Sequence, residues 1–247
     1  MSAEFYVFLI LGAMAGGFIN GLAGSGTALF ALGLYLVVLD PITAVAIVAL
    51  MSVLVGLQGL WIVRGAILAQ PRRLLRFVVP GLIGVPIGIS LLSVINGEAL
   101  RIAIATMLIL YGLYFGFRKN LPAFSGRTPC IDGTVGLFGG ILGGAVAVSG
   151  ALPQIWLSIR PWTKTETRAV LQPFNVAILT TTITLLFLKG AYDRTAVHAL
   201  LVTVPVGLIA AQIGIFVFSR LSDTAFRRIL ILLTLLMGLG VMVSALT

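Results

Sequence analysis

Two glycine-rich apolar segments, one in each half of the chain, constrain its fold more than any other feature. The first is GGFINGLAGSGTALFAL at 16–32 and the second is GILGGAVAVSGALPQIWL at 140–157. An interrupted helix at membrane depth must be buried in protein or line a cavity, because lipid cannot satisfy free backbone groups. We therefore expect two helix–break–helix hairpins, with breaks at Gly21–Thr27 and Ala145–Gly150, whose polar tips face each other.

The composition places the chain in the membrane. Of its 247 residues 60% are hydrophobic and only 9% are charged, and the mean hydropathy is +1.16. Long apolar runs recur from end to end, as in a polytopic all-α membrane protein, whereas a β-barrel would show short alternating segments. The apolar run near the N-terminus follows Glu4 without a Lys or Arg, so we interpret it as mature sequence rather than a secretory signal.

The net charge of +9 does not indicate a nucleic-acid partner. The basic residues lie between the apolar runs, as the positive-inside rule predicts for a protein in a lipid bilayer. The single cysteine, Cys130, excludes an intramolecular disulfide.

The two halves of the sequence repeat each other. Gly12, Gly16, Ser25 and Gly26 match Gly136, Gly140, Ser149 and Gly150 at one constant offset. Such internal repeats are typical of secondary transporters. We expect a first repeat at 1–120 (hairpin 5–39, helices 41–63, 74–95 and 100–117), a linker at 121–131, and a second repeat at 132–247 (hairpin 132–159, helices 169–188, 195–218 and 227–246).

The distribution of basic residues favours inverted repeats. If each hairpin enters and leaves by one face, thirteen basic residues fall on one side and only Arg101, Lys189 and Arg194 on the other. We therefore expect a protein of the cytoplasmic (inner) membrane, with the basic side in the cytoplasm and both termini on the opposite side. The thirteen are Arg64, Arg72, Arg73, Arg76, Arg118, Lys119, Arg127, Arg160, Lys164, Arg168, Arg220, Arg227 and Arg228.

The hairpin tips are the candidate substrate site. All seven acidic residues lie at segment ends or in loops, which argues against a cation or metal site made of carboxylates. The N-terminus of the helix after each break instead offers free N–H groups and a positive dipole end to an anion, without a fixed full charge. The expected substrate-binding residues are Asn20, Ser25, Gly26, Thr27, Ser149, Gly150 and Gln154.

Other interpretations of these polar residues stay open. Ser25 and Ser149 are also suited to cap their own helices. Four amides within helices are suited either to line the pathway or to hydrogen-bond between helices: Gln58, Gln172, Asn175 and Gln212. His198, the only histidine, is a candidate for proton coupling. We expect no catalytic residue, because Gly24-Ser25-Gly26 lacks the base and acid that a serine nucleophile needs. We expect no metal or cofactor, because the sequence shows no metal-ligand spacing and no phosphate-binding loop.

The sequence resembles the sulfite exporter TauE/SafE family, also called the toluene sulfonate uptake permease group. The resemblance rests on GGFINGLAGSG at 16–26, on the second hairpin, and on the arginine–glycine pattern of Arg101–Leu113 and Arg227–Leu239. It covers nearly the whole chain and implies small sulfur-containing anions as substrates, namely sulfite, organosulfonates such as sulfoacetate, or thiosulfate. The thiosulfate branch relays its anion past cysteines, whereas Cys130 lies in the predicted linker.

Together these observations predict a transporter that exports sulfite or an organosulfonate by alternating access, with the anion held between the two tips. A passive anion channel of the same fold and a membrane-embedded assembly or binding subunit are the alternatives. The exact anion, the transport direction, a coupling ion and a homo-oligomeric state stay open.

Overall fold

The computed structural model describes residues 3–91, 102, 105–106, 109–110, 112–114 and 124–246. These residues form helices and contain no strand. The helices are α1 (Ala3–Ala23), α2 (Thr27–Tyr35), α3 (Pro41–Ala69), α4 (Pro71–Leu91), α6 (Pro129–Val146), α7 (Ala151–Ser158), α8 (Lys164–Leu188), α9 (Arg194–Arg220) and α10 (Asp223–Leu246).

Several helices begin at residues whose chemistry favours a helix start. The side chain of Asp40 accepts hydrogen bonds from the amides of Ile42 and Thr43 at the start of α3, and Asp193 does the same for Ala196 in α9. Thr163 forms a capping box with Glu166 at the start of α8. These caps satisfy first-turn amides that have no partner within the helix.

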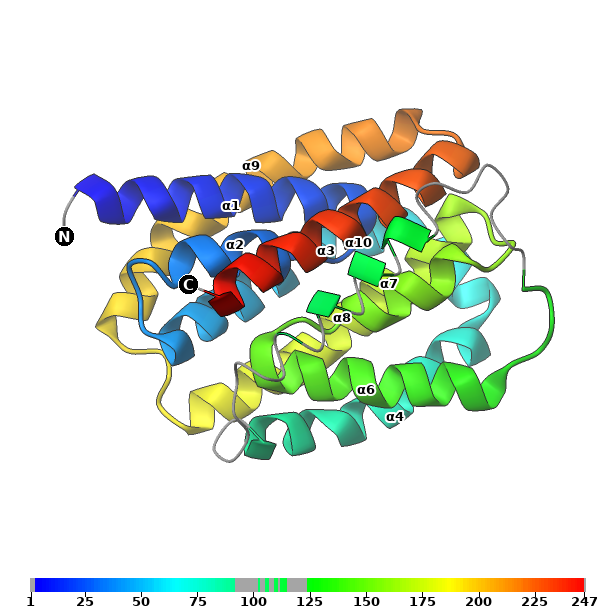
Figure 1. Ribbon diagram of the computed structural model, residues 1–247, viewed down its shortest axis with the longest axis horizontal. Helices are drawn as coiled ribbons and strands as arrows, with labels where there is room; N and C mark the ends of the chain where they lie inside the picture. The colour runs from blue at the N-terminus through cyan, green and yellow to red at the C-terminus, as the bar shows by residue number, and fades with distance from the viewer. Residues whose placement is uncertain are drawn as a thin grey trace.

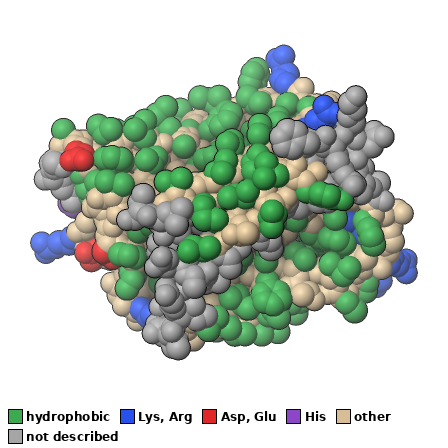
Figure 2. All heavy atoms as spheres, in the orientation of Figure 1, with side chains coloured by type: hydrophobic (Ala, Val, Ile, Leu, Met, Phe, Trp, Pro, Cys, Tyr) green, Lys and Arg blue, Asp and Glu red, His purple; other side chains and the backbone are tan. Residues whose placement is uncertain are grey.

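Six helices among the described residues are long and apolar enough to cross a membrane: α1, α3, α4, α6, α8 and α9. The hairpin arms α2 and α7, with nine and eight residues, are too short. Hydrophobic side chains cover much of the face in Figure 2, and charged side chains lie towards its two ends. The expected all-helical, multi-pass membrane protein is therefore confirmed.

Glycines bring two pairs of helices into close, parallel contact (Figure 1). In α1 and α9, a Cβ on Gly17 would lie 2.4 Å from the carbonyl oxygen of Gly207, and one on Gly21 would lie 2.2 Å from that of Ala211. The α4–α6 pair follows the same rule, since a Cβ on Gly140 would lie 1.9 Å from the oxygen of Gly81. Small residues at these contacts let the backbones approach closely, as in other membrane helix pairs.

The second hairpin leaves the bundle near the point where it enters. The amide of Phe124, before α6, donates to the carbonyl of Ile159, after α7, at 3.0 Å. Arg160 likewise donates to the carbonyl of Gly126 at 2.9 Å. The short arm α7 therefore returns the chain to the end of the molecule from which α6 started.

Several segments differ from the expected boundaries, among them α10, which begins at Asp223 rather than 227. The basic loop expected from Arg64 to Arg73 is absent, because α3 continues to Ala69 and only Gln70 separates it from α4. Helix α8 begins at Lys164 rather than 169, because the Thr163 capping box starts it earlier. Helix α6 begins at Pro129, so Cys130 lies in its first turn and not in a loop. Most of the helix expected at 100–117 lies outside the described residues, as do 121–123 of the linker.

Candidate functional site

Each hairpin is interrupted by a short non-helical segment. Between α1 and α2, Gly24 and Gly26 have φ angles of +86° and +98°, in the left-handed region that glycine adopts without strain. Between α6 and α7, Ala147 has a φ of 57° and Gly150 precedes the first helical residue. The breaks are shorter than the sequence indicated, but they lie within the predicted segments.

The two breaks are in direct contact. A Cβ on Gly150 would lie 2.5 Å from the Cβ of Ser25 and 2.6 Å from its Oγ, so the missing side chain is what admits the serine. Ser25 Oγ donates to Gln154 Oε1 of α7 at 3.1 Å. Gln154 Nε2 in turn donates to the carbonyl of Leu230 and to Thr234 Oγ1 in α10, both at 3.1 Å. Segments 129 residues apart in the sequence therefore meet at one buried polar point.

Neither serine caps its own helix. The N-cap residues of α2 and α7 are Gly26 and Gly150, and neither helix has a side-chain hydrogen bond at its cap. Ser149 Oγ instead donates to Asn175 Oδ1 of α8, and Asn175 Nδ2 is buried without a partner among the described residues. The positive N-terminal ends of two helices therefore lie together, with their first-turn amides not capped by side chains.

A second polar chain runs from the first break into α8. Asn20 Nδ2 donates to Thr27 Oγ1 at 2.8 Å, which ties α1 to the start of α2. Gln172 Nε2 donates to Asn20 Oδ1 at 3.2 Å and to the carbonyl of Gly56 at 3.0 Å. These side chains are buried, at 0–1% exposure. Asn20, Thr27 and Gln172 thus form one network at the first tip.

Arg168 completes this network, and the sequence-based interpretation missed it. We expected a basic residue in a loop, yet Arg168 lies in the second turn of α8, fully buried, and its Nε donates to Gln172 Oε1 at 3.1 Å. A Cβ on Gly24 would lie 3.3 Å from Arg168 Cγ, so its side chain passes beside the first break. A fixed positive charge is therefore present where none was expected. The spacing of Arg168, Gln172 and Asn175 on one face of an apolar helix was the available signal.

The remaining pathway candidates lie elsewhere. Gln212 is exposed on α9, and His198 is exposed near the N-terminus of the same helix. Gln58 is half-buried in α3, and its Oε1 has no partner among the described residues. Of the four amides, only Gln172 and Asn175 bond to residues expected at the tips.

Five of the described carboxylates bond to groups other than the tip residues. Glu166 pairs with Arg73 at 2.9 Å, and Asp132 accepts from Trp156 Nε1 at 2.8 Å. Asp40 and Asp193 cap helices, and Asp223 accepts from the amide of Lys164. The tip region contains two helix N-termini and a guanidinium, and none of these five carboxylates bonds to a tip residue. This excess of positive charge suits an anion.

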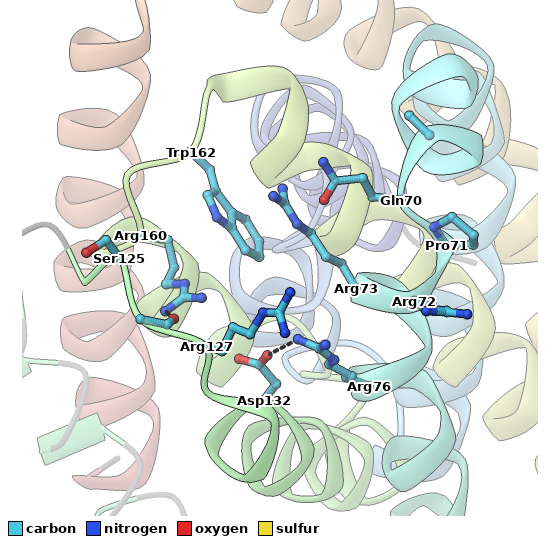
Figure 3. A pocket seen from close by; sticks show the side chains of 12 residues that line it. Gln70, Pro71, Arg72, Arg73, Arg76, Ser125, Arg127, Asp132, Arg160 and Trp162 are labelled. Carbon is cyan, nitrogen blue, oxygen red and sulfur yellow. Dashed lines mark hydrogen bonds and ion pairs between the residues drawn. The ribbon is translucent and has the colours of Figure 1, made fainter.

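A basic cavity of about 510 Å³ opens near the second hairpin (Figure 3). In this view the side chains of Arg76 and Arg127 lie close to Asp132, and the ion pair joins Arg76 to Asp132 at 3.8 Å. Arg73 stacks on Trp162, with 4.6 Å from its guanidinium carbon to the ring centroid. The eight residues of α7, about 12 Å at ~1.5 Å per residue, separate the second break from this cavity. Its five arginines are Arg72, Arg73, Arg76, Arg127 and Arg160.

Comparison with known proteins identifies one relationship. The sequence profile described as "Sulfite exporter TauE/SafE" matches residues 8–241, nearly the full chain. The chain matches no curated protein and no solved structure.

Proposed function

This chain belongs to the sulfite exporter TauE/SafE family, and from this premise we propose that it exports sulfite or an organosulfonate such as sulfoacetate. Membership implies membrane transport of sulfur-containing anions and agrees with a non-enzymatic role. The proposal of sulfite or organosulfonate export rests on this family membership together with the anion-binding chemistry of the two tips.

The contact between Ser25 and Gly150 is the observation that carries the proposal. It brings the N-terminal ends of α2 and α7 together, and a helix N-terminus binds oxyanions through free amides and its dipole. Asn20, Thr27, Ser149 and Gln154 add hydroxyl and amide groups around the same point. We assign the anion to the space that opens between Ser25 and Gly150 when the tips separate.

Inverted repeats would provide that separation. The contacts are reciprocal, since the first hairpin packs through α1 on α9 and the second packs through α6 on α4. Each hairpin thus rests on a helix of the other half, and rocking of one half against the other would part the tips. Alternating access of this kind is common among repeat-based transporters. Because the tip side chains are buried, we interpret the structure as a conformation closed to water.

The basic cavity supports export. Its five arginines all belong to the set that the positive-inside rule assigns to the cytoplasm. A cluster of one charge sign raises the local concentration of an oppositely charged substrate. An inside-negative potential favours the exit of an anion by roughly 2.3 kcal/mol per charge per 100 mV, so the potential alone is sufficient to drive export.

Sulfite uptake into liposomes that contain the purified protein tests this function. We expect saturable uptake that sulfoacetate inhibits and chloride does not. The double variant Ser25→Ala/Ser149→Ala should fold and lose at least about tenfold in rate, because each lost hydrogen bond to a charged group is worth about 1.5–3 kcal/mol. Ser219→Ala is the matched control, since Ser219 is exposed and its hydroxyl donates to the carbonyl of Phe216 within α9.

The outcomes separate the alternatives. Unchanged flux in the double serine variant would exclude the tips as the site. Flux that does not saturate and shows no counterflow would indicate a channel, and no flux above protein-free liposomes would favour a binding or assembly subunit.

A further inference from the structure

Arg168 is a buried cation without a charged partner in the part of the chain that the structure describes. Its side chain is 0% exposed and is one of the largest fully buried side chains among the described residues. Nε donates to Gln172 Oε1, but Nη1 and Nη2 have no hydrogen-bond partner within the described part of the chain. A guanidinium has five N–H donors, and those on Nη1 and Nη2 are four of them.

Among the described residues, neither ion pair that involves a carboxylate includes Arg168. The nearest acid in sequence, Glu166, is bound to Arg73 and to Thr163 at the cap of α8. The contact that remains is with the ring of Phe218 in α9, whose centroid lies 4.4 Å from the guanidinium carbon. A cation–π contact returns only a small part of what a buried charge loses on leaving water. The described surroundings of Arg168 therefore leave its positive charge uncompensated, which favours an anionic ligand.

The unpaired guanidinium lies beside the first break. A Cβ on Gly59 of α3 would lie 2.6 Å from Arg168 Nη2, so the glycine makes room for that end of the side chain. Gly24, which packs on the stem of Arg168, directly precedes Ser25. Through Gln172 the same guanidinium is linked to Asn20 and thus to Thr27.

We propose that Arg168 provides the fixed positive charge of the anion site and binds an oxyanion of the sulfite or sulfonate class through Nη1 and Nη2. This assignment rests on the proposed function and names the group that neutralises the substrate. A planar guanidinium presents two parallel N–H groups that match two oxygens of an oxyanion, which an ammonium cannot do. If Arg168 had only a structural role, it would join α8 to α9 through Phe218, and its replacement would not change the affinity of the protein for anions.

Anion-dependent thermal stability of the purified full-length protein tests the role of Arg168. The melting temperature is measured against increasing sulfite, sulfoacetate and chloride in the wild type, Arg168→Met and Arg220→Met. We expect sulfite to stabilise the wild type and the Kd to rise roughly tenfold to a hundredfold in Arg168→Met. Without anion, Arg168→Met should melt no lower than the wild type, because it removes an uncompensated buried charge. Arg220 is the matched control, because it also stacks on a phenylalanine of α9, Phe216, but is exposed.

Wild-type affinity in Arg168→Met would overturn the proposal. If that variant does not fold, Arg168→Lys decides, since it keeps the charge and loses the planar fork: a weaker sulfite affinity supports the proposal and an unchanged one refutes it.

The double variant Ser25→Ala/Ser149→Ala, measured alongside, separates the two claims. Sulfite binding that depends on Arg168 and not on the serines would retain the arginine site and reject the tips. Dependence on the serines alone would do the reverse, and a wild type that no anion of the panel stabilises would overturn both.

Discussion

At the scale of single residues, Gly150 is the position where the two hairpin tips touch, and it leaves no room for a side chain. We expect Gly150→Ala to reduce sulfite transport at least about tenfold and to destabilise the protein by about 1–3 kcal/mol, because its Cβ would lie 2.5 Å from that of Ser25. The readouts are liposome uptake and the melting temperature. The reduced transport should persist at temperatures where the variant is fully folded.

Gly33→Ala is the control for this substitution. Gly33 lies in α2, and a Cβ there would meet nothing within 4 Å. An alanine should raise helix stability by up to ~1 kcal/mol and leave transport unchanged. Equal transport by the two variants would contradict the close contact of the tips.

The sequence indicated which tip residues are polar, but not how they bond. The repeat offset singled out Ser25 and Ser149 as equivalent, yet the two hydroxyls have different partners, Gln154 and Asn175. Arg168 escaped prediction because a charge four residues after a helix start can point to water or into the bundle. That choice depends on Gly59 and Phe218, which come from other helices.

At the scale of helices, the α4–α6 contact should be as sensitive as the tips. A Cβ on Gly140 would lie 1.9 Å from a backbone oxygen, that of Gly81, which cannot move aside as a side chain can. We expect Gly140→Ala to destabilise the protein by about 1–3 kcal/mol, measured as a lower melting temperature in detergent. Gly133→Ala in the same helix should melt no lower than the wild type, since its nearest neighbour, Pro80, would be 3.6 Å away. Equal melting of the two variants would contradict the packing.

Helix boundaries show what the sequence could predict at this scale. Apolar runs predicted an all-helical membrane protein with several spanning helices, since length and hydropathy largely determine spanning segments. The loop at Arg64–Arg73 was wrong because basic side chains were equated with loops, whereas Arg64 extends from α3 and donates to the carbonyl of Trp61. The early start of α8 was readable, because Thr163 and Glu166 have the spacing of a capping box.

At the scale of the whole molecule, the N-terminus and the arginine cavity lie towards opposite ends. Figure 1 shows the N-terminus at one end of the long axis and the loop before α6 at the other. The cavity arginines come from three parts of the chain, around α4, before α6 and after α7, so the fold collects at one end residues that the sequence scatters. The positive-inside rule assigns that end to the cytoplasm and the N-terminus to the opposite side.

The single cysteine provides a direct test of this orientation. Cys130 is exposed in the first turn of α6, next to Pro129 and beside the basic end of the bundle. We expect a membrane-impermeant maleimide to label Cys130 in inverted membrane vesicles and not in intact cells. In Ala3→Cys/Cys130→Ala the new thiol, at an exposed position near the N-terminus, should react in intact cells. Cys130→Ala alone controls for labelling of other proteins.

Reaction of both thiols from the same side would refute opposite placement of the N-terminus and α6, and with it the two hairpins entering from opposite faces. Exchange of the two labelling patterns would keep the hairpins opposed but reverse the molecule, so that the arginine cavity would collect anions from outside and favour uptake.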